Sequence, residues 1–234
     1  MMLGLPLTNG FDDPDGGLVF DFIEDQRSGP EAYPESFVST GFHGGVITIN
    51  AVEADHALRE SIREAMNESY RTLLGHLRHE SGHYYWSLLD ASAEIYQDFV
   101  ELFGDPEEDY SSALERHYQT PNTAWKNDYI SAYASAHPSE DWAETWAHYL
   151  LIQDALETAY VNGLIPDNPA TMHIESKIQT WANLSVAFNE ISRSAGVRDT
   201  YPFVVTPVVT SKLVFVDRVI ARLARSHSQA WAAC

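Results

Sequence analysis

Apolar side chains form short, strand-like runs in the first fifty residues and follow a helical spacing after them. GLVFDFIED (17–25) and GGVITIN (44–50) are short runs rich in β-branched and aromatic residues, bounded by glycine and other turn formers. This pattern is typical of strands. A stretch rich in proline, glycine and serine, residues 27–36, separates the two runs and predicts a loop. The sequence therefore predicts a small N-terminal sheet.

From Glu53 onward, apolar residues recur every three or four positions, which indicates helices. We predict helices over 53–66, about 69–89, 92–103, 109–118, 138–160, 174–191 and 213–223. Pro138 suits the first turn of its helix, where a backbone N–H is not needed. No repeat or linker divides the chain. We predict a single domain of residues 1–234 with an α+β, mainly α fold, in which 1–52 form the sheet region and 53–234 a helical region.

The most informative motif is HESGH, residues 79–83, inside the helix predicted for about 69–89. Positions i and i+4 lie on one face of a helix, so His79 and His83 can bind the same metal ion. Zinc bound by histidine has Zn–N distances of ~2.0–2.1 Å and a tetrahedral geometry. Glu80 lies beside the first histidine, where a carboxylate can take a proton from a metal-bound water. The motif predicts one catalytic Zn²⁺ ion.

A third ligand is expected from the helix that begins at Pro138. Glu140, Glu144 and His148 are spaced i, i+4 and i+8, and therefore share a helix face. A carboxylate from this helix would complete a His₂Glu site and leave the fourth position for water. By spacing alone, either Glu140 or Glu144 can be that ligand. Asp141 lies about 100° around the helix from Glu140 and is expected to act as a first-turn helix charge.

The composition of the chain limits which partners it can bind and which residue types can bind a metal ion. The formal net charge of −20 would repel a phosphate backbone, so we expect no nucleic-acid partner. No apolar run approaches the ~18–20 residues of a membrane span, and the N-terminal residues lack signal-peptide features, so we expect no membrane association and a cytoplasmic location. The single cysteine, Cys234, excludes a cysteine-based zinc site. The sequence carries no indication of an oligomeric state.

Several blocks of the chain together resemble a bacterial family of zinc-binding metallopeptidases. They are TGFHGGVITINAVEADHALRE (40–60), YRTLLGHLRHESGHYYW (70–86), LFGDPEEDYSSALERHY (102–118), SAYASAHPSEDWAETWAHYL (131–150) and SRSAGVRDTYPFVV (192–205). The resemblance extends over nearly the whole chain and implies a zincin-like fold. Several family members carry a cysteine-rich zinc ribbon ahead of this region, which this sequence lacks.

The block SAYASAHPSEDWAE is also similar to the third-ligand segment of lethal-factor-type zincins. In those proteins a tyrosine precedes the metal-binding glutamate by seven residues, and a second glutamate follows it by four. Tyr133, Glu140 and Glu144 reproduce this spacing. The resemblance implies that Glu140 is the third ligand, that Glu144 holds an imidazole N–H of His79 or His83, and that Tyr133 donates its hydroxyl to the oxyanion.

These observations predict a zinc metallopeptidase that acts on a peptide or protein substrate. Val46, Ile47, Thr48 and Ile49 are expected to form the strand nearest the active-site cleft, where an extended peptide would add to the free edge. Two alternatives remain open. One is a non-catalytic, zinc-stabilised binding module, which a fourth protein ligand such as His76 or His148 would favour. The other is a zinc hydrolase that acts on a non-peptide amide.

Overall fold

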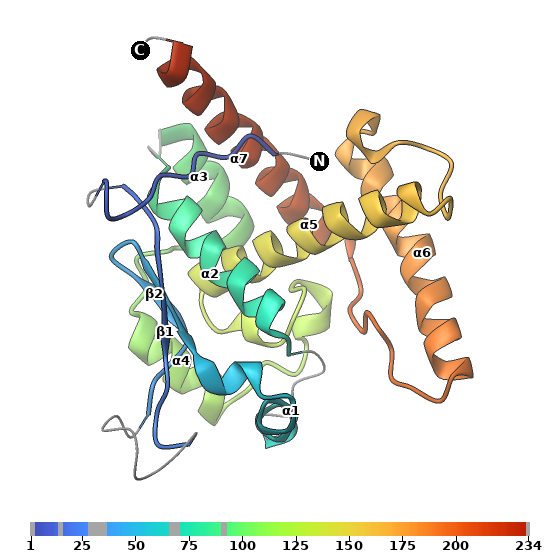
Figure 1. The fold of residues 1–234 in the computed structure, drawn as a ribbon, viewed down its shortest axis with the longest axis horizontal. Helices are drawn as coiled ribbons and strands as arrows, with labels where there is room; N and C mark the ends of the chain where they lie inside the picture. The colour runs from blue at the N-terminus through green and yellow to red at the C-terminus, as the bar shows by residue number, and fades with distance from the viewer. Residues whose placement is uncertain (1–2, 14–15, 28–36, 66–70, 90–92, 233–234) are drawn as a thin grey trace. The chain divides into compact units, whose positions relative to one another are not determined.

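The computed structural model describes residues 3–13, 16–27, 37–65, 71–89 and 93–232 (Figure 1). The loop predicted for 27–36, apart from Arg27, and Cys234 lie outside these residues. The chain forms two compact units, one from Leu7–Leu89 and one from Met1–Pro6 together with Asp90–Cys234. The strands all lie within residues 1–52 and the α-helices all lie after residue 53, and the first two helices belong to the same compact unit as the sheet. The single-domain assignment stays a prediction.

The sheet of the first unit has three strands in the order β1-β3-β2. The strands are β1 (Val19–Ile23), β2 (Gly41–His43) and β3 (Val46–Asn50). β1 pairs with β3 in parallel, with Val19 opposite Val46, and β2 pairs with β3 antiparallel, with Gly41 opposite Thr48. β3 is therefore the central strand, and its Ile47 and Ile49 are almost completely buried.

The position of β3 corrects one expectation. Val46, Ile47 and Thr48 pair with β1 on one side and β2 on the other, and Ile49 pairs with β1, so β3 is not the edge strand that we expected. A role of these four residues in substrate binding stays a prediction. We missed β2 because three residues are too few to show a period. Gly44 and Gly45, with φ of 55° and 82°, form the two-residue turn between β2 and β3. Both positions need φ > 0 in this kind of hairpin turn, so the Gly-Gly pair was the available signal.

The helices of this unit are α1 (His56–Ala65), which follows the short 3₁₀ turn η1 (Ala51–Ala54), and α2 (Leu73–Ser87). Thr72 caps α2, because its hydroxyl accepts the N–H of Gly75 at 2.9 Å. Just ahead of this cap, Arg71 pairs with the buried carboxylate of Glu53 in η1 through two of its nitrogens. The start of α2 is thereby fixed to the end of β3.

The second half of α2 packs on the sheet hairpin of the same unit. The ring of Tyr84 meets that of Phe42 in β2 edge-on, with 6.1 Å between centroids. The hydroxyl of Tyr84 donates to the carbonyl of Gly16 at 3.0 Å. These contacts fix which face of α2 points away from the sheet.

The second unit is helical. Its elements are α3 (Ala93–Phe103), α4 (Tyr110–Gln119), η2 (Trp125–Asn127), η3 (Tyr133–Ser135), α5 (Pro138–Val161), η4 (Pro169–Thr171), α6 (Ile174–Ser194) and α7 (Pro207–Ala232). α5 contacts α3, α6, α7 and η3, and is the central helix of this unit (Figure 1). Its buried residues lie on all sides, from Pro138 to Ala159, as expected of a helix enclosed by others.

An aromatic cluster joins three of these helices. Phe99 and Phe103 of α3 stack at 4.8 Å, and both rings approach Trp142 of α5 and Phe215 of α7 within 6.3 Å. Trp142 and Trp146 are almost fully buried. Aromatic pairs at such separations add to the hydrophobic contribution of burial. The cluster therefore fixes the N-terminal half of α5.

A buried ion pair lies next to this cluster. Nζ of Lys212, in α7, is 2.6 Å from Oδ2 of Asp141, in the first turn of α5, and also donates to the carbonyl of Asp128 at 2.7 Å. Both side chains are at most 3% exposed. Asp141 is an acid in the first turn of its helix, as the sequence predicts, and it is in addition a fully buried partner of Lys212. Burial raises the pKa of the Asp141 carboxyl, and the Lys212 ammonium opposes that rise.

The α+β, mainly α fold class is confirmed. Each predicted helix is present, with ends that differ by a few residues, except that the last helix extends over Pro207–Ala232 rather than 213–223. Among the described residues, none of the helices combines the length and the apolar character that a membrane crossing requires.

Replacing Lys212 with Met should destabilise the protein, because it leaves the Asp141 carboxylate buried without its cation. Breaking a buried pair in this way costs about 3–5 kcal/mol of unfolding free energy. Urea unfolding of the variant measures the loss. The double variant Asp141→Asn/Lys212→Met should recover much of it, and Lys126→Met, at an exposed lysine, is the control. An unchanged unfolding midpoint for Lys212→Met would contradict the importance of the pair.

Candidate metal centre

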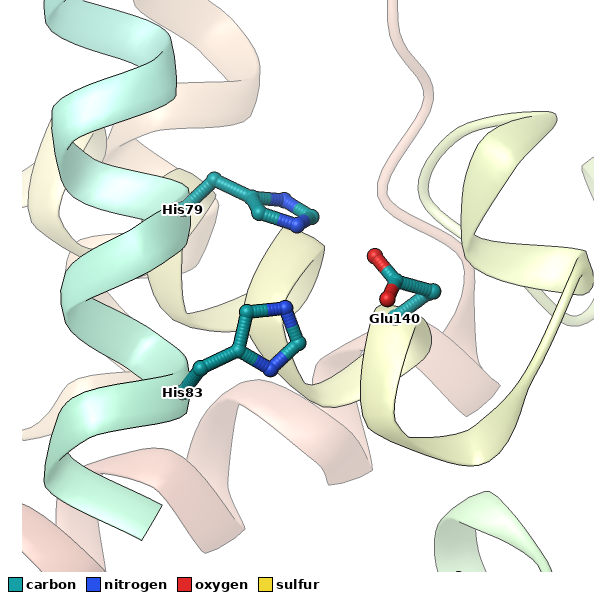
Figure 2. A group of neighbouring side chains, drawn as sticks. All are labelled: His79, His83 and Glu140. Carbon is teal, nitrogen blue, oxygen red and sulfur yellow. The ribbon is translucent and has the colours of Figure 1, made fainter. Parts of the chain in front are cut away.

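The two motif histidines lie one turn apart on α2, as the sequence predicted. Their rings are 5.0 Å apart between centroids, at an interplanar angle of 73°. Both imidazoles project from the same side of the helix (Figure 2). His79 is 8% exposed and His83 is half-buried. α2 is anchored at its start by Thr72 and Arg71 and on its length by Tyr84, so the two rings are held by a fixed helix.

Glu80 follows His79 on α2 and is only 7% exposed. A carboxylate buried to this extent needs a polar or cationic partner. Its position beside the first histidine satisfies the sequence requirement for a proton acceptor near a metal-bound water.

Glu140 lies in the first turn of α5 and is 3% exposed. His137 caps this helix: its Nδ1 accepts the N–H of Ser139 at 3.1 Å, and its carbonyl accepts the N–H of Glu140 at 3.0 Å. Nε2 of His137 also lies 3.0 Å from the carbonyl of Glu108. With Pro138 at the first helical position, these contacts place the Glu140 side chain at a well-defined helix start.

Tyr133 lies in η3, just ahead of α5, and is partly exposed. Burial first, and then the negative charge of Glu140, raise the pKa of the Tyr133 hydroxyl well above its ordinary value. The hydroxyl is therefore protonated at neutral pH and remains able to donate a hydrogen bond.

Glu144, one turn after Glu140, accepts a hydrogen bond that the sequence did not indicate. Oγ of Ser131 donates to its Oε2 at 2.5 Å, and the same Oγ accepts the N–H of Ala134 at 3.1 Å. Glu144 therefore interacts with the turn that carries Tyr133. Its expected interaction with an imidazole of His79 or His83 stays a prediction.

One ligand atom from each of His79, His83 and Glu140 lies within 4.8 Å of the other two (Figure 2). Within the described part of the chain, this is the one group of three or more His, Cys, Asp and Glu side chains that could hold a metal ion. Two imidazole nitrogens and a carboxylate oxygen are the donor set of catalytic His₂Glu zinc sites. The residues therefore fit a zinc ion.

The two histidines considered as possible fourth ligands have other neighbours. Nδ1 of His76 lies 3.7 Å from the carboxylate of Glu53. Nδ1 of His148 shares a 2.9 Å hydrogen bond with the hydroxyl of Tyr201. Neither histidine belongs to the group formed by the three candidate ligands.

Two residues near the candidate site were missed from sequence, Ser131 and Lys212. A serine two residues before a short 3₁₀ turn is too common a pattern to single out. Lys212 directly precedes the apolar stripe that begins at Leu213. This position was the signal in the sequence that Lys212 lies at the edge of the core.

Comparisons with known proteins agree with the donor set. A sequence model of the family described as "Putative zinc-binding metallo-peptidase" matches residues 1–219. An uncharacterized protein of Mycobacterium bovis is 45% identical over 231 residues, which cover 95% of this chain and 65% of the relative. Uncharacterized proteins from two strains of Mycobacterium tuberculosis match with the same identity and coverage. The chain thus spans about 65% of the length of these relatives.

No solved structure matches the chain. The family match covers nearly all of it, including both histidines of the motif and the first turns of α5. The resemblance found in the sequence is thereby confirmed. The chain belongs to this family of zinc-binding metallopeptidases.

Proposed function

We propose that this protein hydrolyses peptide bonds at one zinc ion held by His79, His83 and Glu140. The observation that carries the proposal is the grouping of these three ligand atoms, with the buried Glu80 directly after the first histidine. When bound, zinc supplies Lewis acidity, which lowers the pKa of a coordinated water and polarises a carbonyl oxygen.

Glu80 is the general base in this proposal. Its carboxylate accepts a proton from the attacking water and later delivers it to the amine nitrogen as the C–N bond breaks. Tyr133 donates its hydroxyl to the substrate oxygen that becomes negatively charged in the tetrahedral intermediate. The raised pKa of Tyr133 keeps that donor protonated.

An extended peptide needs a strand edge, and β2 offers one beside α2. β2 is an edge strand of the sheet, and Phe42 in it packs against Tyr84, the residue after His83. Main-chain hydrogen bonds to such an edge bind a peptide with little demand on its side chains.

The set of three protein ligands favours hydrolysis over a purely structural zinc site. A structural site is closed by four protein ligands, whereas three leave a position for water. Action on a non-peptide amide would use the same residues. A broad peptide library, tested on the wild type and on Glu80→Gln, distinguishes the two hydrolase activities.

Glu80→Gln should keep its zinc and lose most peptide hydrolysis. The amide retains the shape of the side chain but accepts no proton, and general-base catalysis contributes roughly 10²–10⁴-fold. Zinc content by elemental analysis and kcat on a cleaved peptide test this directly. Glu94→Gln, on the exposed side of α3, should leave both quantities unchanged. If Glu80→Gln and the wild type hydrolyse the peptide with equal kcat, the proposal is wrong.

Glu140→Ala should lose zinc at neutral pH, because it removes one of three ligands. Glu144→Ala should weaken zinc binding about 10–100-fold, the effect of losing a residue that orients a ligand. Zinc affinity is measured by competition with a chromophoric chelator. Glu157→Ala, further along α5, is the control. If Glu144→Ala strips the metal and Glu140→Ala retains it, the two roles are reversed.

Removing zinc should lower the melting temperature, since binding to the folded state alone stabilises it. At a free zinc concentration of 1,000 times Kd, the stabilisation is about 4 kcal/mol. Calorimetry with a chelator, followed by added zinc, should show a fall and a recovery. The Glu140→Ala variant should show neither. A wild-type melting curve that is unchanged after verified zinc removal would contradict the link.

A further inference from the structure

The turn that carries Tyr133 is short and has no strand or long helix of its own to fix it. It lies between η2 and α5 and contains one 3₁₀ turn, η3. The position of the Tyr133 hydroxyl therefore depends on side chains that tie this turn to its surroundings.

Ser131 is one of the side chains that fix the backbone of this turn. It is 8% exposed, and its Oγ uses its proton for Oε2 of Glu144 at 2.5 Å. Because that proton is committed, a lone pair of Oγ is left to accept the N–H of Ala134 at 3.1 Å. The two bonds anchor the backbone on either side of Tyr133, at positions 131 and 134.

These bonds join the turn to the helix that provides the candidate third ligand. Glu144 lies one turn after Glu140 on α5, so the Ser131 hydroxyl couples Tyr133 to the same rigid helix. The atom that accepts the Ser131 hydroxyl is Oε2 of Glu144.

The start of the segment is tied to α5 in a second way. Lys212 donates both to the carbonyl of Asp128 and to the carboxylate of Asp141, next to Glu140. Because Lys212 fixes Asp128, only the backbone between Asp128 and α5 can still move, and Ser131 lies in that part of the chain.

We propose that Ser131, held by Glu144, is a positioning residue for Tyr133, and that it places the Tyr133 hydroxyl where the oxyanion develops. The inference rests on the proposed function, in which Tyr133 is the oxyanion donor. Ser131 touches neither substrate nor metal and acts through the turn.

The test is a double-mutant cycle on zinc-loaded protein. Tyr133→Phe should lower kcat by roughly 10²–10³-fold, as for loss of one oxyanion donor. Ser131→Ala should lower kcat by about 10-fold or more, since small misplacements of a catalytic group are costly, with KM and zinc content unchanged. In the Tyr133→Phe background, Ser131→Ala should cost nothing further, because the hydroxyl that it positions is absent.

Two variants separate positioning from general stability. Ser131→Thr keeps the hydroxyl and should restore much of kcat. Ser135→Ala removes a hydroxyl from the same turn, one that donates to the carbonyl of Ala132, and should leave kcat unchanged. If the loss of kcat is proportional to the fall in melting temperature across all these variants, Ser131 has only a structural role and the proposal is overturned.

The remaining outcomes are also decisive. If the losses from Ser131→Ala and Tyr133→Phe multiply, Ser131 does not act through Tyr133 and the positioning role is refuted, while the proposed function stands. If Tyr133→Phe hydrolyses peptide at the wild-type rate, the oxyanion step of the proposed function fails, and the role of Ser131 fails with it. If Ser131→Ala retains wild-type kcat, the proposal is wrong.

Discussion

Two adjacent carboxylates, Glu140 and Asp141, are buried in the first turn of α5, and each must be compensated by other groups of the protein or by a bound cation. The N-terminus of a helix favours negative charge, but only by ~0.3–1 kcal/mol at exposed positions, far less than removing a carboxylate from water costs. Asp141 is compensated by Lys212. A carboxylate oxygen of Glu140 lies within 4.8 Å of a ring nitrogen of each of His79 and His83, and in the proposed function these three residues hold the zinc ion. In the proposed function, Asp141 therefore has a structural role and its neighbour Glu140 a role as metal ligand.

Around this turn, the chain builds a preorganised set of groups from α5 and the segment just before it. His137 caps the helix, Lys212 ties its first turn to the preceding segment, and Ser131 ties the Tyr133 turn to Glu144. Groups held in place before substrate binds do not have to be ordered during reaction. The first unit achieves the same for α2, whose start is fixed by the Arg71 pair with Glu53.

Much of the fold could be predicted because its elements show strong periods in sequence. The helices were predicted from apolar spacing, and the HExxH positions from the i, i+4 rule. The short strand β2 has three residues and shows no period, so the central position of β3 was missed. The Gly44-Gly45 turn was the local signal for the β2–β3 hairpin, whereas the parallel pairing of β1 with β3 joins segments more than twenty residues apart.

By itself, the sequence determined that His79 and His83 share a helix face, and that Glu80 lies beside them, because helix geometry fixes these relations locally. It also narrowed the third ligand to two glutamates on one helix. Only the tertiary structure decided which of the acids near Pro138 pairs with Lys212, seventy-one residues away, and which serine holds Glu144. Such partners are chosen by packing between helices distant in sequence, where burial makes an unmatched charge or hydroxyl costly.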